Sequence, residues 1–115
     1  MAEIKPKLQS LRIPAGWKVD VNTLYELEPS LQTIDWFSGS ILFSAVQRKL
    51  GYEVYVRWEP QSDPAGVFFL QRYLLKYEEQ GDSVLEGYFV DEQRIGDRQR
   101  LVERLEAYML MSEWT

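Results

Sequence analysis

The chain has 115 residues, 45% of them hydrophobic, and a formal charge of −5 at pH 7. It contains no histidine and no cysteine, which excludes cysteine nucleophiles, histidine-based triads, disulfide bonds and ordinary zinc sites. The negative charge argues against general nucleic-acid binding, because such binding depends on Lys and Arg neutralising phosphates. The length and the apolar content predict one domain with its own hydrophobic core.

The first ten residues have no clear strand or helix pattern and include three charged side chains, so we expect residues 1–10 to be a mobile lead-in to a single domain over residues 11–115. The start lacks the apolar region of a secretory signal. No run approaches the ~20 apolar residues of a membrane helix. Together with the absence of cysteine, these features favour a cytoplasmic protein that does not enter a membrane.

The first expected strand covers residues 17–27, where apolar and polar side chains alternate after a Pro14-Ala15-Gly16 turn. Alternation of this kind places one face of a strand in the core and the other in solvent. The run is long for one strand, so we expect a bend or bulge near Asn22. Pro29 ends the strand, because proline cannot donate to a β-ladder.

Residues 38–51 fit two structures. As a helix, they offer Arg48 and Lys49 in the last turn and Gly51 as the terminating residue. As a strand, they form a hairpin with the segment that follows. We favour the strand, because the neighbouring segments read as a meander.

Three further strands are expected downstream. Residues 52–58 alternate cleanly, and residues 67–76 carry apolar side chains on both faces. Two apolar faces indicate a central strand covered on both sides, or a strand whose second face meets a partner. Residues 84–90 form another expected strand, interrupted by Gly87.

The strongest helix pattern runs from Asp97, which can cap the first turn, to about Met111. Its apolar stripe consists of Leu101, Val102, Leu105, Tyr108 and Met109. We therefore predict an α+β fold, in which an antiparallel sheet of four to six strands is packed by one C-terminal helix. The predicted core comprises Trp17, Val19, Val21, Val54, Val56, Trp58, Phe69, Leu101 and Leu105.

Acidic residues gather between Lys76 and Arg94 with no cation among them. This acidic belt consists of Glu78, Glu79, Asp82, Glu86, Asp91 and Glu92. Such a surface attracts a basic protein partner and speeds association. The alternative is a solvated rim that keeps a small protein soluble.

Paired carboxylates can perform acid–base chemistry, and Glu26 and Glu28 share a face of the first expected strand. A small sheet-and-helix domain, however, leaves little room for a substrate cleft. We therefore expect no enzymatic activity and no cofactor. No Asp-rich loop has the spacing of an EF-hand, so we expect no metal site either.

Four arginines cluster around the start of the expected helix: Arg94, Arg98, Arg100 and Arg104. Guanidinium groups suit phosphate, and helix N-termini attract anions. We favour intramolecular pairing of these arginines with the acidic belt, because the belt lies immediately upstream and the total charge is negative.

Two aromatic features have alternative explanations. Leu110 and Trp114 share a helical face if the helix continues that far, and such a patch would serve a contact or a homodimer. If the helix ends near Leu110, the tail folds back onto the body instead. Trp36 and Phe37, in the connection after the first strand, either anchor a loop to the core or form a recognition tip.

The segment Leu11-Arg12-Ile13-Pro14-Ala15-Gly16-Trp17-Lys18-Val19, with Asn22 and Glu26, resembles the opening of a family of small uncharacterised bacterial proteins found mainly in Firmicutes. The later segments Tyr52-Glu53-Val54-Tyr55-Val56-Arg57-Trp58-Glu59-Pro60 and Asp63-Pro64-Ala65-Gly66 are similar to a second signature of that group. Arg57 departs from the small residue expected before the tryptophan. Some members look like immunity proteins encoded beside secreted toxins, so the resemblance implies an immunity or other interaction role.

These patterns favour a non-enzymatic cytoplasmic protein that binds a protein partner, in its most specific form an immunity-type inhibitor of a basic toxin. Self-association through the C-terminal helix is the alternative, and a carboxylate enzyme or small-ligand binder comes third. The candidate partner-binding residues are Glu78, Glu79, Asp82, Glu86, Trp36, Phe37, Leu110 and Trp114.

Overall fold

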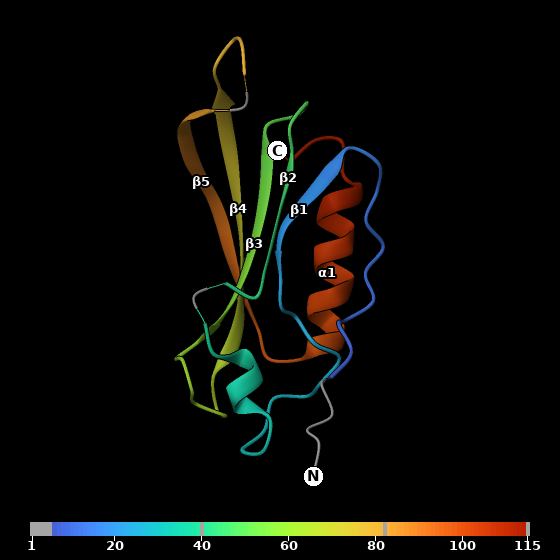
Figure 1. Ribbon diagram of the computed structural model, residues 1–115, viewed down its shortest axis with the longest axis vertical. Coiled ribbons are helices and arrows are strands. Elements are labelled where there is room, and N and C mark those ends of the chain that lie inside the picture. Colours follow the sequence, from blue (N-terminus) through green and yellow to red (C-terminus); the bar gives the residue numbers. More distant parts are fainter. Residues whose placement is uncertain (1–5, 40, 82, 115) are drawn as a thin grey trace.

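The computed structural model describes residues 6–39, 41–81 and 83–114. Over these residues the chain forms a five-stranded antiparallel sheet, with strand order β1-β2-β3-β4-β5, and one α-helix (Figure 1). This confirms the predicted α+β fold. The elements are β1 (Trp17–Asn22), the 3₁₀ helix η1 (Ile34–Phe37), β2 (Phe43–Gln47), β3 (Tyr52–Glu59), β4 (Val67–Tyr77), β5 (Val84–Ile95) and α1 (Arg98–Leu110).

The strands follow the predicted meander with two differences in length. β1 ends at Asn22, the position of the expected bend, and its register with β2 shifts between Val19 and Val21. β5 runs to Ile95 and is longer than the expected strand over residues 84–90. The ambiguous segment 38–51 contains β2, which pairs with β3, so the favoured strand is correct.

The helix α1 begins as predicted. The side chain of Asp97 accepts a hydrogen bond from the backbone N–H of Gln99, which satisfies one of the free donors in the first turn. The helix buries Leu101, Leu105, Tyr108 and Met109 against the sheet. Val102, the fifth residue of the predicted stripe, is half-buried.

The sheet has two unlike faces. Alternation along β3 turns Val54, Val56 and Trp58 toward α1 and the core, and we call this the covered face. The 3₁₀ helix η1 lies on the same side, because Phe37 packs against Trp58 and Phe68. The opposite face, which we call the open face, carries Glu53, Tyr55, Arg57, Phe69, Gln71, Tyr73, Glu92 and Arg94.

Most predicted core residues occupy core positions. Val54, Val56, Trp58, Leu101 and Leu105 are buried. Trp17 and Val19 are partly buried against the core, and Val21 is half-buried. Phe69 was placed in the core wrongly: it lies on the open face, because its register partner across β3 is Arg57.

The chain ahead of the first strand is also tied to the body. Gln9 N donates to Leu24 O at 2.8 Å, and Glu26 N donates to Lys7 O at 2.8 Å. Backbone pairing therefore begins inside the predicted lead-in, earlier than the expected domain start at residue 11.

The molecule is elongated, with principal extents of 51 × 28 × 23 Å. Pairing between β3 and β4 stops at Tyr52 and Leu74, whereas β4 and β5 remain paired up to Tyr77 and Val84. The end of the β4–β5 hairpin therefore extends past the rest of the sheet and past the end of α1 (Figure 1). We call residues 74–89 the projecting hairpin.

Gly51 supports the base of the projecting hairpin. Its carbonyl accepts a hydrogen bond from Leu75 N at 2.7 Å. Its φ angle is +69°, and a Cβ atom there would lie only 2.6 Å from the carbonyl oxygen of Leu75. The close approach of these two backbones requires glycine.

Candidate functional site

The projecting hairpin exposes apolar side chains that the rest of the fold does not cover. Leu74, Val84, Leu85, Tyr88 and Phe89 are between 40% and 57% exposed. The first six residues of β5 are all exposed. Because clustered exposed apolar residues mark contact sites more often than isolated ones do, this hairpin is the main candidate surface.

These apolar side chains lie on both faces of the hairpin. Leu74 and Tyr88 face each other across the strands on the covered-face side. Phe89 lies on the open face, where its ring packs edge-on against Tyr73 at 5.7 Å between centroids. A partner that contacts this hairpin therefore meets apolar surface on two sides.

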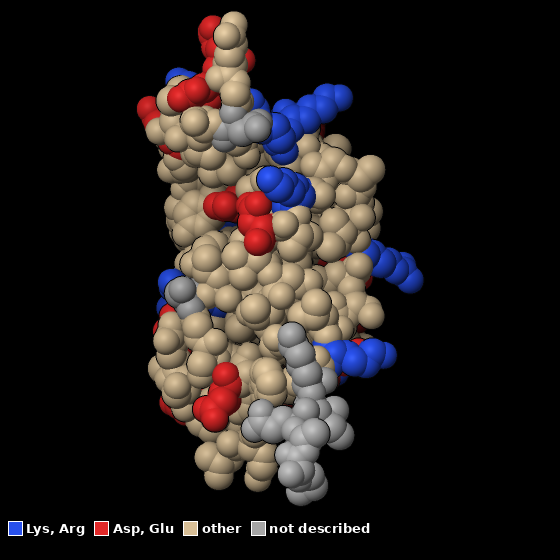
Figure 2. All heavy atoms as spheres, in the orientation of Figure 1, with Lys and Arg blue, Asp and Glu red and all other residues tan. Residues whose placement is uncertain are grey.

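The acidic belt does not form one continuous surface. Glu78 and Glu79 lie at the turn of the hairpin, and Glu86 lies opposite Lys76 within it. Asp82 lies outside the described residues. Acidic side chains gather at the top of the molecule in Figure 2, where Figure 1 places this turn.

The remaining members of the belt have internal partners. Asp91 accepts a hydrogen bond from Arg72 Nε at 2.8 Å, and this hydrogen bond is the main reason why the pKa of Asp91 is lowered. Glu92, on the other face, accepts from Gln71 at 2.7 Å. The predicted pairing of the belt with the four arginines is confirmed only for Arg94, whose Nε lies 3.7 Å from a carboxylate oxygen of Glu92. Within the described residues, no ion pair joins Arg98, Arg100 or Arg104 to the belt.

A cation also reaches the tip of the hairpin. Arg48, from the β2–β3 turn, donates to Gly81 O at 2.6 Å, and its guanidinium lies 3.9 Å from the ring centroid of Tyr77. The tip is therefore mixed in charge, with an excess of carboxylates among its described residues.

The open face is hollowed beside the hairpin. A cavity of about 440 Å³ lies there, lined by Gly16, Lys18, Asp20, Val46, Arg48, Glu53, Leu75, Tyr77 and Val84. Burial raises the pKa of Glu53, and the charge of Asp20 raises it further. Two cations and two carboxylates line the cavity, so it has no net preference for either sign.

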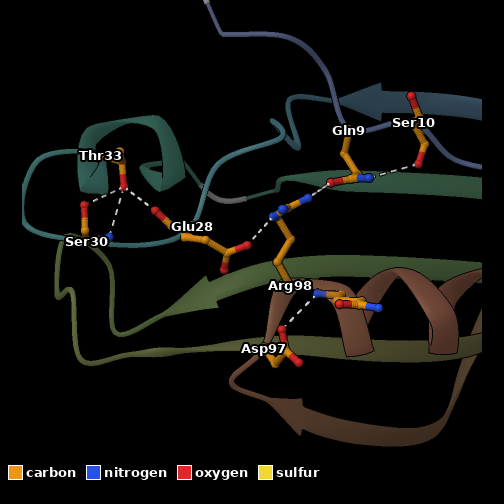
Figure 3. Close-up of polar contacts among 8 residues, drawn as sticks. Gln9, Ser10, Glu28, Ser30, Thr33, Asp97 and Arg98 are labelled. Atoms are coloured by element: carbon orange, nitrogen blue, oxygen red, sulfur yellow. Dashed lines mark hydrogen bonds and ion pairs between the residues drawn. The ribbon is translucent and has the colours of Figure 1, made fainter.

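The expectation that Glu26 and Glu28 share a face of the first strand is wrong. Glu26 and Glu28 lie after the end of β1, and Glu28 accepts a hydrogen bond from Arg98 Nε at 2.8 Å (Figure 3). Arg98 also donates to the side chain of Gln9. It therefore joins the start of α1 to the N-terminal segment and to the loop before η1, which is a structural role.

Three of the predicted contact residues pack in the core or against it. Phe37 is 1% exposed, and Trp36 packs against the core with its ring 5.3 Å from that of Tyr25. Trp114 is 6% exposed, because α1 ends at Leu110 and the tail folds back. The alternative in which the tail folds back onto the body is thus correct. Leu110 is 68% exposed, but it does not form the predicted patch with Trp114.

The described residues contain no group of three or more acidic side chains placed to hold a metal ion. Within the same part of the chain, no helix has both the length and the apolar character needed to cross a bilayer.

No family model matches the chain, and neither a curated protein nor a solved structure matches it.

The exposed apolar residues of β5 were missed by the sequence analysis as a site. The available signal was the run of apolar side chains on both faces of residues 67–76, one explanation of which was a face that meets a partner. Residues 84–89 also carry apolar side chains at both odd and even positions, namely Val84, Leu85, Tyr88 and Phe89.

Proposed function

We propose that this chain is a non-enzymatic binding protein that holds a protein partner on the projecting hairpin. The observation that carries the proposal is the set of five exposed apolar residues on a hairpin that extends past the sheet. Aromatic side chains such as Tyr88 and Phe89 provide large contact areas at interfaces. Burial of apolar area by a partner would supply the main favourable free energy.

A basic partner fits this surface best. Glu78 and Glu79 at the turn and Glu86 on β5 outnumber Lys76 and Arg48 nearby. Carboxylates around an apolar contact area steer a basic protein toward it and reject acidic proteins. With the resemblance to small bacterial proteins, this favours an immunity-type inhibitor that acts in the cytoplasm on a basic toxin.

The test measures binding to the product of the neighbouring gene by calorimetry. Leu85→Ser combined with Tyr88→Ser should weaken binding at least tenfold, because both side chains lie in the proposed contact area. Leu110→Ser is the control, since it removes an exposed apolar side chain from another element. Equal weakening by both variants would contradict the assignment of the hairpin, and absence of binding by the parent would contradict the immunity role.

Self-association through β5 is the second candidate. β5 is an edge strand, and no backbone hydrogen bond of the described residues reaches its outer edge. Such an edge is a template for another strand. Sedimentation velocity tests it: a dimer that Leu85→Ser with Tyr88→Ser dissociates supports the candidate, and a parent that stays monomeric at all concentrations rules it out.

A further inference from the structure

A second cavity lies between the later part of β5 and α1. Its volume is about 490 Å³, and its lining residues are Gln93, Arg94, Ile95, Arg100, Glu103, Arg104 and Ala107. It takes in the last three residues of an edge strand and one side of the helix. We call it the arginine groove.

The arginine groove is cationic in an otherwise acidic protein. Three guanidinium groups line it, and Glu103 is its only carboxylate, so the lining carries a net charge of +2. Arg100 and Arg104 are four residues apart on α1, which places them on one side of the helix, one turn apart. Arg94 approaches from the strand.

The two helical arginines are not held by a partner in the described part of the chain, although the charge of Arg104 acts at a distance on Tyr108. Within the described residues, neither Arg100 nor Arg104 takes part in an ion pair, a hydrogen bond or a ring contact. Arg98, in contrast, is bound by Glu28 and Gln9 (Figure 3). Arg94 is only weakly engaged, since its Nε lies 3.7 Å from Glu92 and its guanidinium 5.0 Å from the ring of Phe69.

We propose that the arginine groove binds a phosphate monoester. A phosphate monoester carries a charge of nearly −2 at neutral pH and three acceptor oxygens, which matches the net +2 lining. Guanidinium groups bind such oxygens in pairs of parallel hydrogen bonds. The cavity is larger than a phosphate group alone requires, so it has room for the organic part of the ester.

A monocarboxylate matches the groove less well. It would neutralise only half of the surplus charge, and it has two oxygens to share among three guanidinium groups. The proposal therefore predicts an order of affinity, with a phosphate monoester above a simple carboxylate and chloride without specific binding.

The test is an NMR titration of the ¹⁵N-labelled full chain with glycerol 2-phosphate, at constant ionic strength kept with sodium chloride. Amide signals of residues 93–95 and 100–107, and the Nε–H signals of Arg100 and Arg104, should shift and saturate. Lowering the pH from 7.5 to 5.5 should weaken binding about fourfold, because a monoester with a second pKa of about 6 is then mostly a monoanion.

Two variants and one ligand control decide the outcome. Arg100→Gln with Arg104→Gln should weaken binding at least tenfold, whereas Lys49→Gln, which removes an exposed cation from the β2–β3 turn, should leave it within twofold. Acetate should shift the same signals less, without saturation. Shifts that do not saturate, that persist in the double variant, or that acetate reproduces in full would overturn the proposal.

Discussion

The indole ring of Trp114 stacks on the phenol ring of Tyr52, with the ring centroids 4.2 Å apart and the planes 8° from parallel. Trp114 also donates from Nε1 to Tyr108 O at 2.8 Å. The tail after α1 thereby closes the end of the core beside the projecting hairpin. Trp114 is a stabilising residue rather than a contact residue.

Trp114→Ala should therefore lower the free energy of unfolding by about 3–5 kcal/mol, the usual cost of truncating a buried tryptophan. Urea denaturation measures this. Leu110→Ala should change it by less than about 0.5 kcal/mol, because Leu110 is exposed. Similar values for the two variants would show that the tail does not pack as described.

Gly51→Ala should destabilise the protein by about 2 kcal/mol, because the positive φ and the carbonyl of Leu75 both oppose a side chain. Thermal unfolding measures the effect. Gly96→Ala is the control: its φ lies outside the left-handed region, and the nearest atom to a Cβ there would be 3.9 Å away. A cost no larger at Gly51 than at Gly96 would contradict the close contact between this turn and β4.

Asp91 links stability to acidic pH. The hydrogen bond from Arg72 holds the pKa of Asp91 below its usual value, so the contact stabilises the fold above about pH 4 and is lost as the pH falls through the folded-state pKa. Asp91→Asn should cost about 1 kcal/mol at pH 7, a modest value because Asp91 is partly exposed. The difference from the parent should shrink toward pH 3; a difference that is constant with pH would be contrary evidence.

The contribution of Glu53 to stability should change with pH in the opposite direction to that of Asp91. Burial and the nearby Asp20 raise the pKa of Glu53, so its ionisation opposes folding as the pH rises through the folded-state pKa. Glu53→Gln should therefore stabilise the protein at pH 7, and the gain should vanish below about pH 4. Glu79→Gln, at an exposed position, serves as the control, and identical pH profiles for the two variants would refute the assignment.

The carboxylates at the turn should act on association kinetics. Glu78→Lys with Glu79→Lys should slow association with a basic partner, most strongly at low salt, because exposed charges are screened as salt rises. Stopped-flow measurements at two ionic strengths test this. Glu26→Lys with Asp35→Lys is the control, because it makes the same charge change at exposed positions elsewhere. If both double variants slow association equally, the rate depends on the net charge of the protein and not on the carboxylates at the turn.

Local sequence patterns predicted an element correctly where one face of that element packs in the core and the other faces solvent. Alternation identified β3, the cap at Asp97 identified the start of α1, and both are confirmed. Phe69 was misplaced because both faces of β4 are apolar, so alternation alone does not say which face α1 covers.

The candidate site was harder to predict, because it depends on where neighbouring elements stop. Leu85 and Tyr88 are exposed because β3 and α1 end before the hairpin does, a long-range property that residues 84–90 do not carry. Trp114 is buried for the converse reason: its core partners Tyr52 and Tyr108 are supplied by β3 and α1.

Hydrogen–deuterium exchange of the free and partner-bound protein tests the central claim most directly. Binding on the projecting hairpin should slow exchange of the amides in residues 74–77 and 84–90 and leave residues 98–110 unchanged, because a partner covers those strands and excludes water from them. Protection confined to other elements, with exchange in the hairpin unaltered on binding, would contradict the assignment of the hairpin as the binding surface.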